Sequence, residues 1–172
     1  MDPLIRPATP EDAAAIASVH VQSWQETYAG LIPPDFLAHM TSAEMRERRA
    51  ASWRATIDQA REAVRVAEQG GELVAFASVG PARDHPGYGA ELMCLYSLAR
   101  VQGRGTGRAL LHAAAQDAWA SGARNLALWV LDVNPTRAWY ARQGAREAGE
   151  KRDGELREIR MVWDELTALL VR

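Results

Sequence analysis

The chain has 172 residues, of which 48% are hydrophobic and 24% charged, so it can bury a core and has the composition of an ordinary globular protein. A formal net charge of −2 provides no global positive field, which argues against a nucleic-acid binder. No apolar run approaches the roughly 20 residues that a membrane span requires, and the first residues do not resemble a signal peptide.

These bounds predict one domain over residues 1–172, no membrane attachment and, by default, a cytoplasmic location. Cys94 is the only cysteine, which excludes an intrachain disulfide and a cysteine-based metal motif, and we expect no metal. Because Cys94 lies among apolar residues in the middle of an expected strand, we expect it to be buried and inert.

The first half of the sequence predicts short strands and two helices. Thr9 followed by Pro10 and two acidic residues is a typical helix start, because threonine caps free amides and proline fits the first helical position. Gly30 and the Pro33-Pro34 pair end this helix, and Gly70-Gly71 predicts a hairpin turn. The expected elements are a strand at residues 4–7, a helix from Pro10 to about Tyr28, a helix at about 42–60, and strands at 64–67 and 73–79.

In the second half, strands and helices alternate. The continuous apolar run at residues 126–131 is typical of a strand that is covered on both faces. The expected elements are a loop at 81–89, a strand at 91–98, a helix at 108–121, a strand at 126–131, a short helix from Pro135 to near Gly144, a hairpin of 146–150 and 158–163 around Asp153-Gly154, and a helical tail at 164–172. Strand–helix–strand–helix after an antiparallel start predicts a mixed α/β sheet.

Three glycines at alternate positions, Gly103, Gly105 and Gly107, lie between an expected strand and an expected helix. Glycines so spaced would cost backbone entropy inside a regular element, whereas a sharply turning loop that approaches a ligand needs them. The amides of such a loop and of the next helix form an anion site. The pattern therefore predicts a phosphate or pyrophosphate held by the main chain, whereas a glycine-rich turn without a ligand needs another reason for all three glycines.

Two common phosphate motifs do not fit this loop. A P-loop requires lysine and serine or threonine after its last glycine, and here Arg108 and Ala109 follow Gly107. A dinucleotide fingerprint requires glycine or alanine at the position that Arg108 occupies. The order Q-x-x-G-x-G after a strand and before a helix, from Gln102 to Gly107, resembles motif A of the GNAT N-acetyltransferase family.

The resemblance extends over nearly the whole chain, with motif A at residues 91–121, a region like motif B at 126–144, and a looser likeness at 23–33, where family members wall the acceptor site. It implies an α/β fold with a central, mostly antiparallel sheet, a parallel strand pair at the CoA site and flanking helices. It also implies transfer of an acetyl group from acetyl-CoA to a primary amine of a small molecule or peptide. Homodimers are common in the family.

The resemblance assigns the cofactor contacts mainly to the backbone. Residues 95–97 would run beside the pantetheine arm like an added strand, the loop and helix start would hold the pyrophosphate, and Arg100 or Arg104 would meet the nucleotide phosphate. The expected cofactor-binding residues are Leu95, Tyr96, Ser97, Gln102, Gly103, Arg104, Gly105, Thr106, Gly107, Arg108 and Asn134.

Asn134 has two interpretations. The family usually has an asparagine seven residues before its catalytic tyrosine, where it binds the pantetheine arm, but Val133 occupies that position here. Asn134 would serve through a shifted turn, or it would only cap the helix that begins at Pro135.

Acetyl transfer to an amine needs a neutral amine, a stabilised oxyanion and a proton for the departing thiolate. Tyr140 resembles the family tyrosine, four residues before a glycine, that protonates the sulfur; its alternative is a core tyrosine. Glu91, eleven residues before Gln102, has the offset of the base glutamate in histone-type members; its alternatives are an exposed strand-end carboxylate or a water chain. Asp84, His85 and Glu26 are reserve candidates for the base.

Two other functions remain open at the level of sequence. One is transfer of a longer acyl chain, which the space beside Tyr96 and Trp129 would decide. The other is a non-catalytic CoA-binding or regulatory module, against which the intact glycine loop and Tyr140 argue. The six tryptophans, Trp24 and Trp53 among them, form either an aromatic acceptor wall or part of the core.

Overall fold

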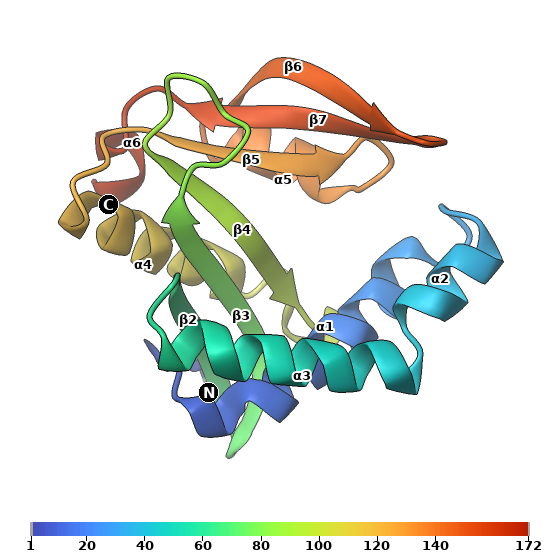
Figure 1. Ribbon diagram of the computed structural model, residues 1–172. Coiled ribbons are helices and arrows are strands. Elements are labelled where there is room, and N and C mark those ends of the chain that lie inside the picture. Colours follow the sequence, from blue (N-terminus) through green and yellow to red (C-terminus); the bar gives the residue numbers. More distant parts are fainter. Residues whose placement is uncertain (1, 172) are drawn as a thin grey trace. The chain divides into compact units, whose positions relative to one another are not determined.

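A computed structural model describes residues 2–171 of the chain (Figure 1). Within these residues, seven strands are hydrogen-bonded in the order β1-β2-β3-β4-β5-β7-β6. The chain divides into two compact units, the first made of the residues up to Ser78 with Cys94–Ala114, and the second of Val79–Met93 with the residues from Ala115 onward. Strands β3 (Glu72–Pro81) and β4 (Ala90–Ser97) contribute to both units.

The first unit also contains β1 (Leu4–Pro7), the 3-10 turn η1 (Pro10–Asp12), α1 (Ala13–Tyr28), α2 (Pro34–Met40), α3 (Ala43–Asp58), β2 (Ala63–Gln69), the 3-10 turn η2 (Ala99–Val101) and the start of α4 (Thr106–Ala120). Helix α2 is an element that the sequence analysis missed, because Pro33-Pro34 was interpreted as a break. Pro34 occupies the first position of α2, where a proline loses no helical hydrogen bond and fixes a suitable φ.

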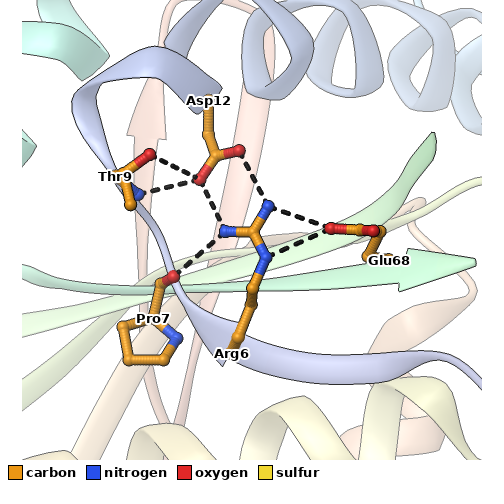
Figure 2. A network of polar contacts seen from close by, with 5 residues as sticks. All are labelled: Arg6, Pro7, Thr9, Asp12 and Glu68. Carbon is orange, nitrogen blue, oxygen red and sulfur yellow. Dashed lines mark hydrogen bonds and ion pairs between the residues drawn. The ribbon is translucent and has the colours of Figure 1, made fainter. Parts of the chain in front are cut away.

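The start of the first helix is built as predicted and is tied to two strands. Asp12 Oδ2 accepts a hydrogen bond from the Thr9 amide at 2.8 Å, which completes a capping box. The Arg6 guanidinium of β1 contacts Asp12 at 2.8 Å and Glu68 of β2 at 3.1 Å (Figure 2). The Arg6 hydrogen bond is the largest cause that lowers the pKa of Asp12. One arginine therefore joins β1, β2 and the helix start.

The core of the first unit lies where α1 and α3 pack on the sheet. Helices α1 and α3 are neighbours, and their apolar faces meet side chains of β2 and β3. Its buried members include Ile16, Val19, Trp53, Val66, Phe76 and Leu98. Cys94 packs against this cluster but is only half-buried, so the expectation of a fully buried cysteine is wrong.

The second unit contains β5 (Leu126–Leu131), α5 (Thr136–Arg142), β6 (Arg146–Asp153), β7 (Leu156–Trp163), α6 (Thr167–Leu170) and parts of β3, β4 and α4. Ala90 and Glu91 of β4 pair in parallel with Leu126 and Ala127 of β5. Strand β7 pairs antiparallel with β5 and with β6. The predicted mixed α/β sheet, mostly antiparallel with one parallel pair and flanked by helices, is confirmed.

Several predicted boundaries differ from the structure. The last hairpin is longer than expected, and β6 carries a register shift between Glu147 and Glu150, where Gly149 has a φ of 128°. The tail helix covers only Thr167–Leu170, and Arg172, which the prediction included, lies outside the described residues. None of the helices within residues 2–171 has the length and apolar character needed to cross a bilayer.

Candidate active site

The glycine loop follows β4 and leads directly into α4. Gly103 and Gly105 have φ values of 73° and 86°, a left-handed conformation that side chains with a Cβ rarely adopt. A Cβ built on either residue meets no heavy atom within 4 Å, so the loop is open on that side. Helix α4 begins at Thr106, two residues earlier than predicted, and Gly107 lies in its first turn. The two left-handed glycines therefore turn the chain sharply between β4 and α4.

The start of α4 offers polar groups to a ligand. The first amides of a helix lack intrahelical acceptors. In α4 the Ala109 amide is bonded to the Gly105 carbonyl at 3.0 Å, so the amides open to a ligand are those that precede Ala109. Thr106 is 3% exposed, and its Oγ1 has no hydrogen-bond partner within the described part of the chain. A buried hydroxyl without a partner costs free energy, so this orphaned group fits a site completed by a ligand.

Side chains around the loop have distinct roles. Gln102 Nε2 donates to the Ser97 carbonyl at 3.1 Å and so ties the loop to the end of β4. Arg100 forms an ion pair with Glu72 at 3.0 Å, whereas Arg104 and Arg108 are exposed. Of the two arginines predicted for the nucleotide phosphate, Arg100 is held by a carboxylate, whereas Arg104 has no such ion pair within residues 2–171.

Tyr140 lies in α5 in an aromatic environment. It is 6% exposed, and its ring makes edge contacts with Trp139 and Trp163 at centroid distances of 5.2 and 6.1 Å. The glycine four residues later has a structural role, because Gly144 has a φ of 93° and its amide closes the helix end on Ala141. Asn134 Oδ1 accepts from the Thr136 amide at 2.9 Å, whereas the N-cap position of α5 is occupied by Pro135, so Asn134 closes a local turn just before the helix.

Glu91 lies at the start of β4, beside two residues of the preceding loop. Its Oε2 accepts from the Arg83 amide at 3.1 Å, and its Oε1 lies 3.3 Å from Nε2 of the buried His85. Arg160 Nε donates to His85 Nδ1 at 3.1 Å, and its Nη2 donates to the Asp84 carbonyl at 2.8 Å. The structure therefore brings together Glu91 and two of the three reserve candidates for the base.

The protonation of His85 follows from these contacts. Burial lowers the pKa of His85, and the nearby Glu91 carboxylate opposes this shift only in part. In the neutral ring, Nδ1 is the acceptor for Arg160, so Nε2 carries the proton. Nε2 lies 3.3 Å from Glu91 Oε1 but has no hydrogen-bond partner with good geometry among the described residues. A neutral imidazole therefore lies beside the Glu91 side chain.

Two cationic residues near Glu91 and His85 were not predicted from the sequence. They are Arg160 and Lys151, and both contact the ring of Trp129, on which His85 stacks. His85 stacks on the Trp129 ring at 5.2 Å, while the Lys151 and Arg160 cations lie 4.4 and 4.5 Å from its centroid. Arg160 is opposite Trp129 in the β5–β7 pairing. Only that register could have indicated the contact, since nothing local in the sequence does.

The first unit contains a separate aromatic cluster around His20 of α1. The His20 ring stacks on Tyr96 with 4.7 Å between the ring centroids, and its centroid lies 5.8 Å from that of Phe76 and 6.4 Å from that of Trp24. Trp24 in turn lies 4.8 Å from Tyr28. Trp53 is a core residue, whereas Trp24 is only partly buried. The third reserve candidate, Glu26, accepts from the Ala99 amide at 2.7 Å and so caps the turn after β4.

Burial, and secondarily the charge of Arg49, lowers the pKa of His20 to about 3. In the unfolded chain the pKa of this histidine is higher, near 6.5. The contribution of His20 to the free energy of unfolding is therefore fully retained above pH 6.5 and is lost as the pH decreases from 6.5 toward 3. Glutamine cannot titrate, so His20→Gln lacks this dependence. Between pH 7.5 and 5 we expect wild type to lose about 2 kcal/mol more stability than His20→Gln.

Urea unfolding of both proteins at the two pH values measures this difference. His85 and the carboxylates titrate in both proteins and cancel in the comparison. Equal losses in the two proteins would show that folded His20 takes up a proton as easily as the unfolded chain does.

Comparison with known proteins agrees with this geometry. The sequence profile of the Acetyltransferase (GNAT) family matches residues 24–145. The chain is 33% identical over 171 residues to the uncharacterized N-acetyltransferase YuaI of Bacillus subtilis (strain 168), covering 96% of this chain and 95% of that protein.

Solved structures show the same fold. The PaiA N-acetyltransferase from Thermoplasma acidophilum, in complex with coenzyme A, superposes with a TM-score of 0.76 at 20% identity, covering 93% of this chain and 98% of that one. The yncA protein from Salmonella typhimurium with its cofactor acetyl-CoA gives a TM-score of 0.70 at 23% identity, with coverages of 96% and 95%. Together with the profile match over most of the chain, these likenesses establish that the protein belongs to the GNAT acetyltransferase family, whose members use acetyl-CoA as acyl donor.

Proposed function

We propose that the protein transfers the acetyl group of acetyl-CoA to a primary amine of a small molecule or peptide by direct attack of the amine on the thioester. The left-handed glycine loop that opens α4 is the observation that carries this proposal, because it fits the pyrophosphate of a CoA ester. The open space at Gly103 and Gly105 and the orphaned hydroxyl of Thr106 support it.

The backbone would hold most of the cosubstrate. In the proposed complex, Leu95–Ser97 bind the pantetheine arm as an added strand, and the amides of residues 103–108 bind the pyrophosphate. Arg104 and Arg108 add positive charge beside the phosphates. A contact of Asn134 with the pantetheine arm stays a prediction, because its side-chain oxygen accepts from the Thr136 amide in the turn before α5.

The chemistry then needs two proton transfers. The amine attacks the thioester carbonyl, a C–N bond forms, the C–S bond breaks, and the amine loses a proton while the CoA thiolate gains one. We assign the acid to Tyr140, since a phenol is neutral and protonated at pH 7. We assign the base to Glu91, whose Oε1 lies 3.3 Å from the buried His85 ring.

The direct test is to mix the pure protein with acetyl-CoA and a panel of amines and to follow free thiol. Thiol release that depends on one amine class supports the proposal, whereas tight CoA binding without release by any amine favours the non-catalytic CoA-binding module. Replacing acetyl-CoA by propionyl- and butyryl-CoA in the same assay tests the alternative of a longer acyl donor. A homodimer, a single domain and a cytoplasmic location stay predictions.

Glu91→Gln should reduce turnover most at low pH and leave acetyl-CoA affinity nearly unchanged. At low pH most of the amine is protonated, so loss of the base should lower turnover most in that pH range. Glutamine retains an oxygen that can accept from the Arg83 amide, so the loop should keep its conformation. A pH–rate profile and calorimetry with acetyl-CoA measure the two effects.

Glu44→Gln is a suitable control, because Glu44 is an exposed carboxylate on α3 that forms an ion pair with Arg48, one turn along the helix. If the pH–rate profile of Glu91→Gln coincides with those of wild type and this control, Glu91 has no part in the mechanism and a water chain is the base.

A further inference from the structure

A partly buried guanidinium on α3 forms no ion pair within the described residues. Arg49 Nη1 donates to the Met40 carbonyl at 2.5 Å, and its guanidinium carbon lies 5.8 Å from the centroid of the Trp24 ring. Arg48, its neighbour on the exposed face of the helix, pairs with Glu44 at 2.7 Å. Buried charges in proteins are normally paired, so an Arg49 without a carboxylate needs an explanation.

The surroundings of Arg49 contain further polar atoms without partners. Nδ1 of His20 and Nε1 of Trp24 are buried, and neither has a hydrogen-bond partner among residues 2–171. Burial lowers the pKa of Arg49, and the groups that act on it electrostatically are Tyr96 and Cys94, with no carboxylate among them. One cation, one indole N–H and one neutral imidazole are thus gathered in an aromatic cluster with no anion to match them.

We propose that Arg49, with Trp24 and His20, binds the carboxylate of the acetyl acceptor, so that the acceptor is an amine of the amino-acid type. The guanidinium fork matches a carboxylate, and the indole N–H is a further donor. A phosphate dianion fits less well, because the site has a single positive charge and a neutral His20. The aromatic rings would pack against an apolar body of the acceptor. This inference rests on the proposed acetyl transfer.

The first test uses the wild-type protein alone. Each of the 20 common L-amino acids is compared with its carboxamide as acceptor, and thiol release gives kcat/KM for both. For the best acceptors we expect the acid to exceed its amide by roughly 10- to 100-fold, the range of one hydrogen-bonded charged contact. The proposal is overturned if no acid exceeds its amide.

The second test assigns the preference to Arg49. In Arg49→Gln we expect the acid-to-amide ratio to fall to about one, mainly through an increase of KM for the acid. Arg49→Lys should keep part of the preference, because it retains the charge without the fork. Arg48→Gln, which alters a solvent-exposed arginine on the same helix, should behave like wild type.

Calorimetry separates this inference from the proposed function. Titration of each of the 20 L-amino acids into the protein without acetyl-CoA reports binding even when no amine releases thiol. If an amino acid binds wild type but not Arg49→Gln, the carboxylate site is supported even when no acetyl transfer is detected. An unchanged acid-to-amide ratio in folded Arg49→Gln would overturn the assignment, and if that variant does not fold, the wild-type ratio and Arg49→Lys decide.

Discussion

Gly105→Trp abolishes measurable acetyl-CoA binding and leaves the chain folded: this is the largest effect that we expect. The Cβ of residue 105 would point into open space at the start of α4, where the pyrophosphate is proposed to lie. An indole there would occupy the cradle and turn the amides away from the ligand. The left-handed φ of 86° adds roughly 1–2 kcal/mol of strain, which a stable domain tolerates.

Gly71→Trp is the matched control for this experiment. Gly71 has a φ of 82°, equally open space around its Cβ and a place in the β2–β3 turn. Both variants should show similar losses of thermal stability, but only Gly105→Trp should lose the calorimetric signal with acetyl-CoA. Unchanged CoA affinity in Gly105→Trp would remove the pyrophosphate from this loop.

Tyr140→Phe should lower the rate of acetyl transfer by roughly 100-fold or more, as loss of one positioned acid usually does. The change removes a hydroxyl and keeps the ring contacts with Trp139 and Trp163, so α5 should survive. Acetyl-CoA affinity should change little, since the backbone is proposed to hold most of the cosubstrate. The loss should therefore fall on turnover, as for a contact made mainly in the transition state.

A donor with a more acidic leaving thiol should reduce the effect, because its thiolate needs a proton less. Tyr88→Phe is the control, since it removes another hydroxyl of the second unit, one that donates to Asp164 at 2.8 Å. Single-turnover rates of the two variants decide the matter. A wild-type rate in Tyr140→Phe would make Tyr140 a core residue and would leave protonation to water or another group.

Local sequence patterns were sufficient for most elements of the fold. The apolar run of β5 predicted its bounds, residues 126–131, without error, and Thr9-Pro10 predicted the first helix start. The pattern failed for α2, because Pro33-Pro34 can end one helix or begin another and only the packing of the next turn decides. The bulge in β6 depends on pairing with β7 and has no local signal.

The candidate site was predictable only where its chemistry is local. The glycines of the loop need their own backbone angles, so their pattern is visible in the sequence. The contact between His85 and Arg160 joins residues 75 positions apart and depends on strand register. It also depends on Asn125, whose side chain binds both Gly87 and Gly89 and so fixes the loop that carries His85. Such distant contacts follow from the fold and not from a motif.

The Arg6 contacts bear on how this protein would aggregate. Strand β1 covers one edge of β2 and is short, and the guanidinium that links Asp12 and Glu68 adds to its attachment. The pKa of Asp12 is lowered mainly by Arg6, so this contact weakens as the pH falls and Asp12 takes up a proton, and the attachment of β1 weakens with it. The uncovered N–H and C=O groups of β2 would then be a template for strands of other molecules. Storage near neutral pH, where Asp12 stays ionised, keeps that edge closed.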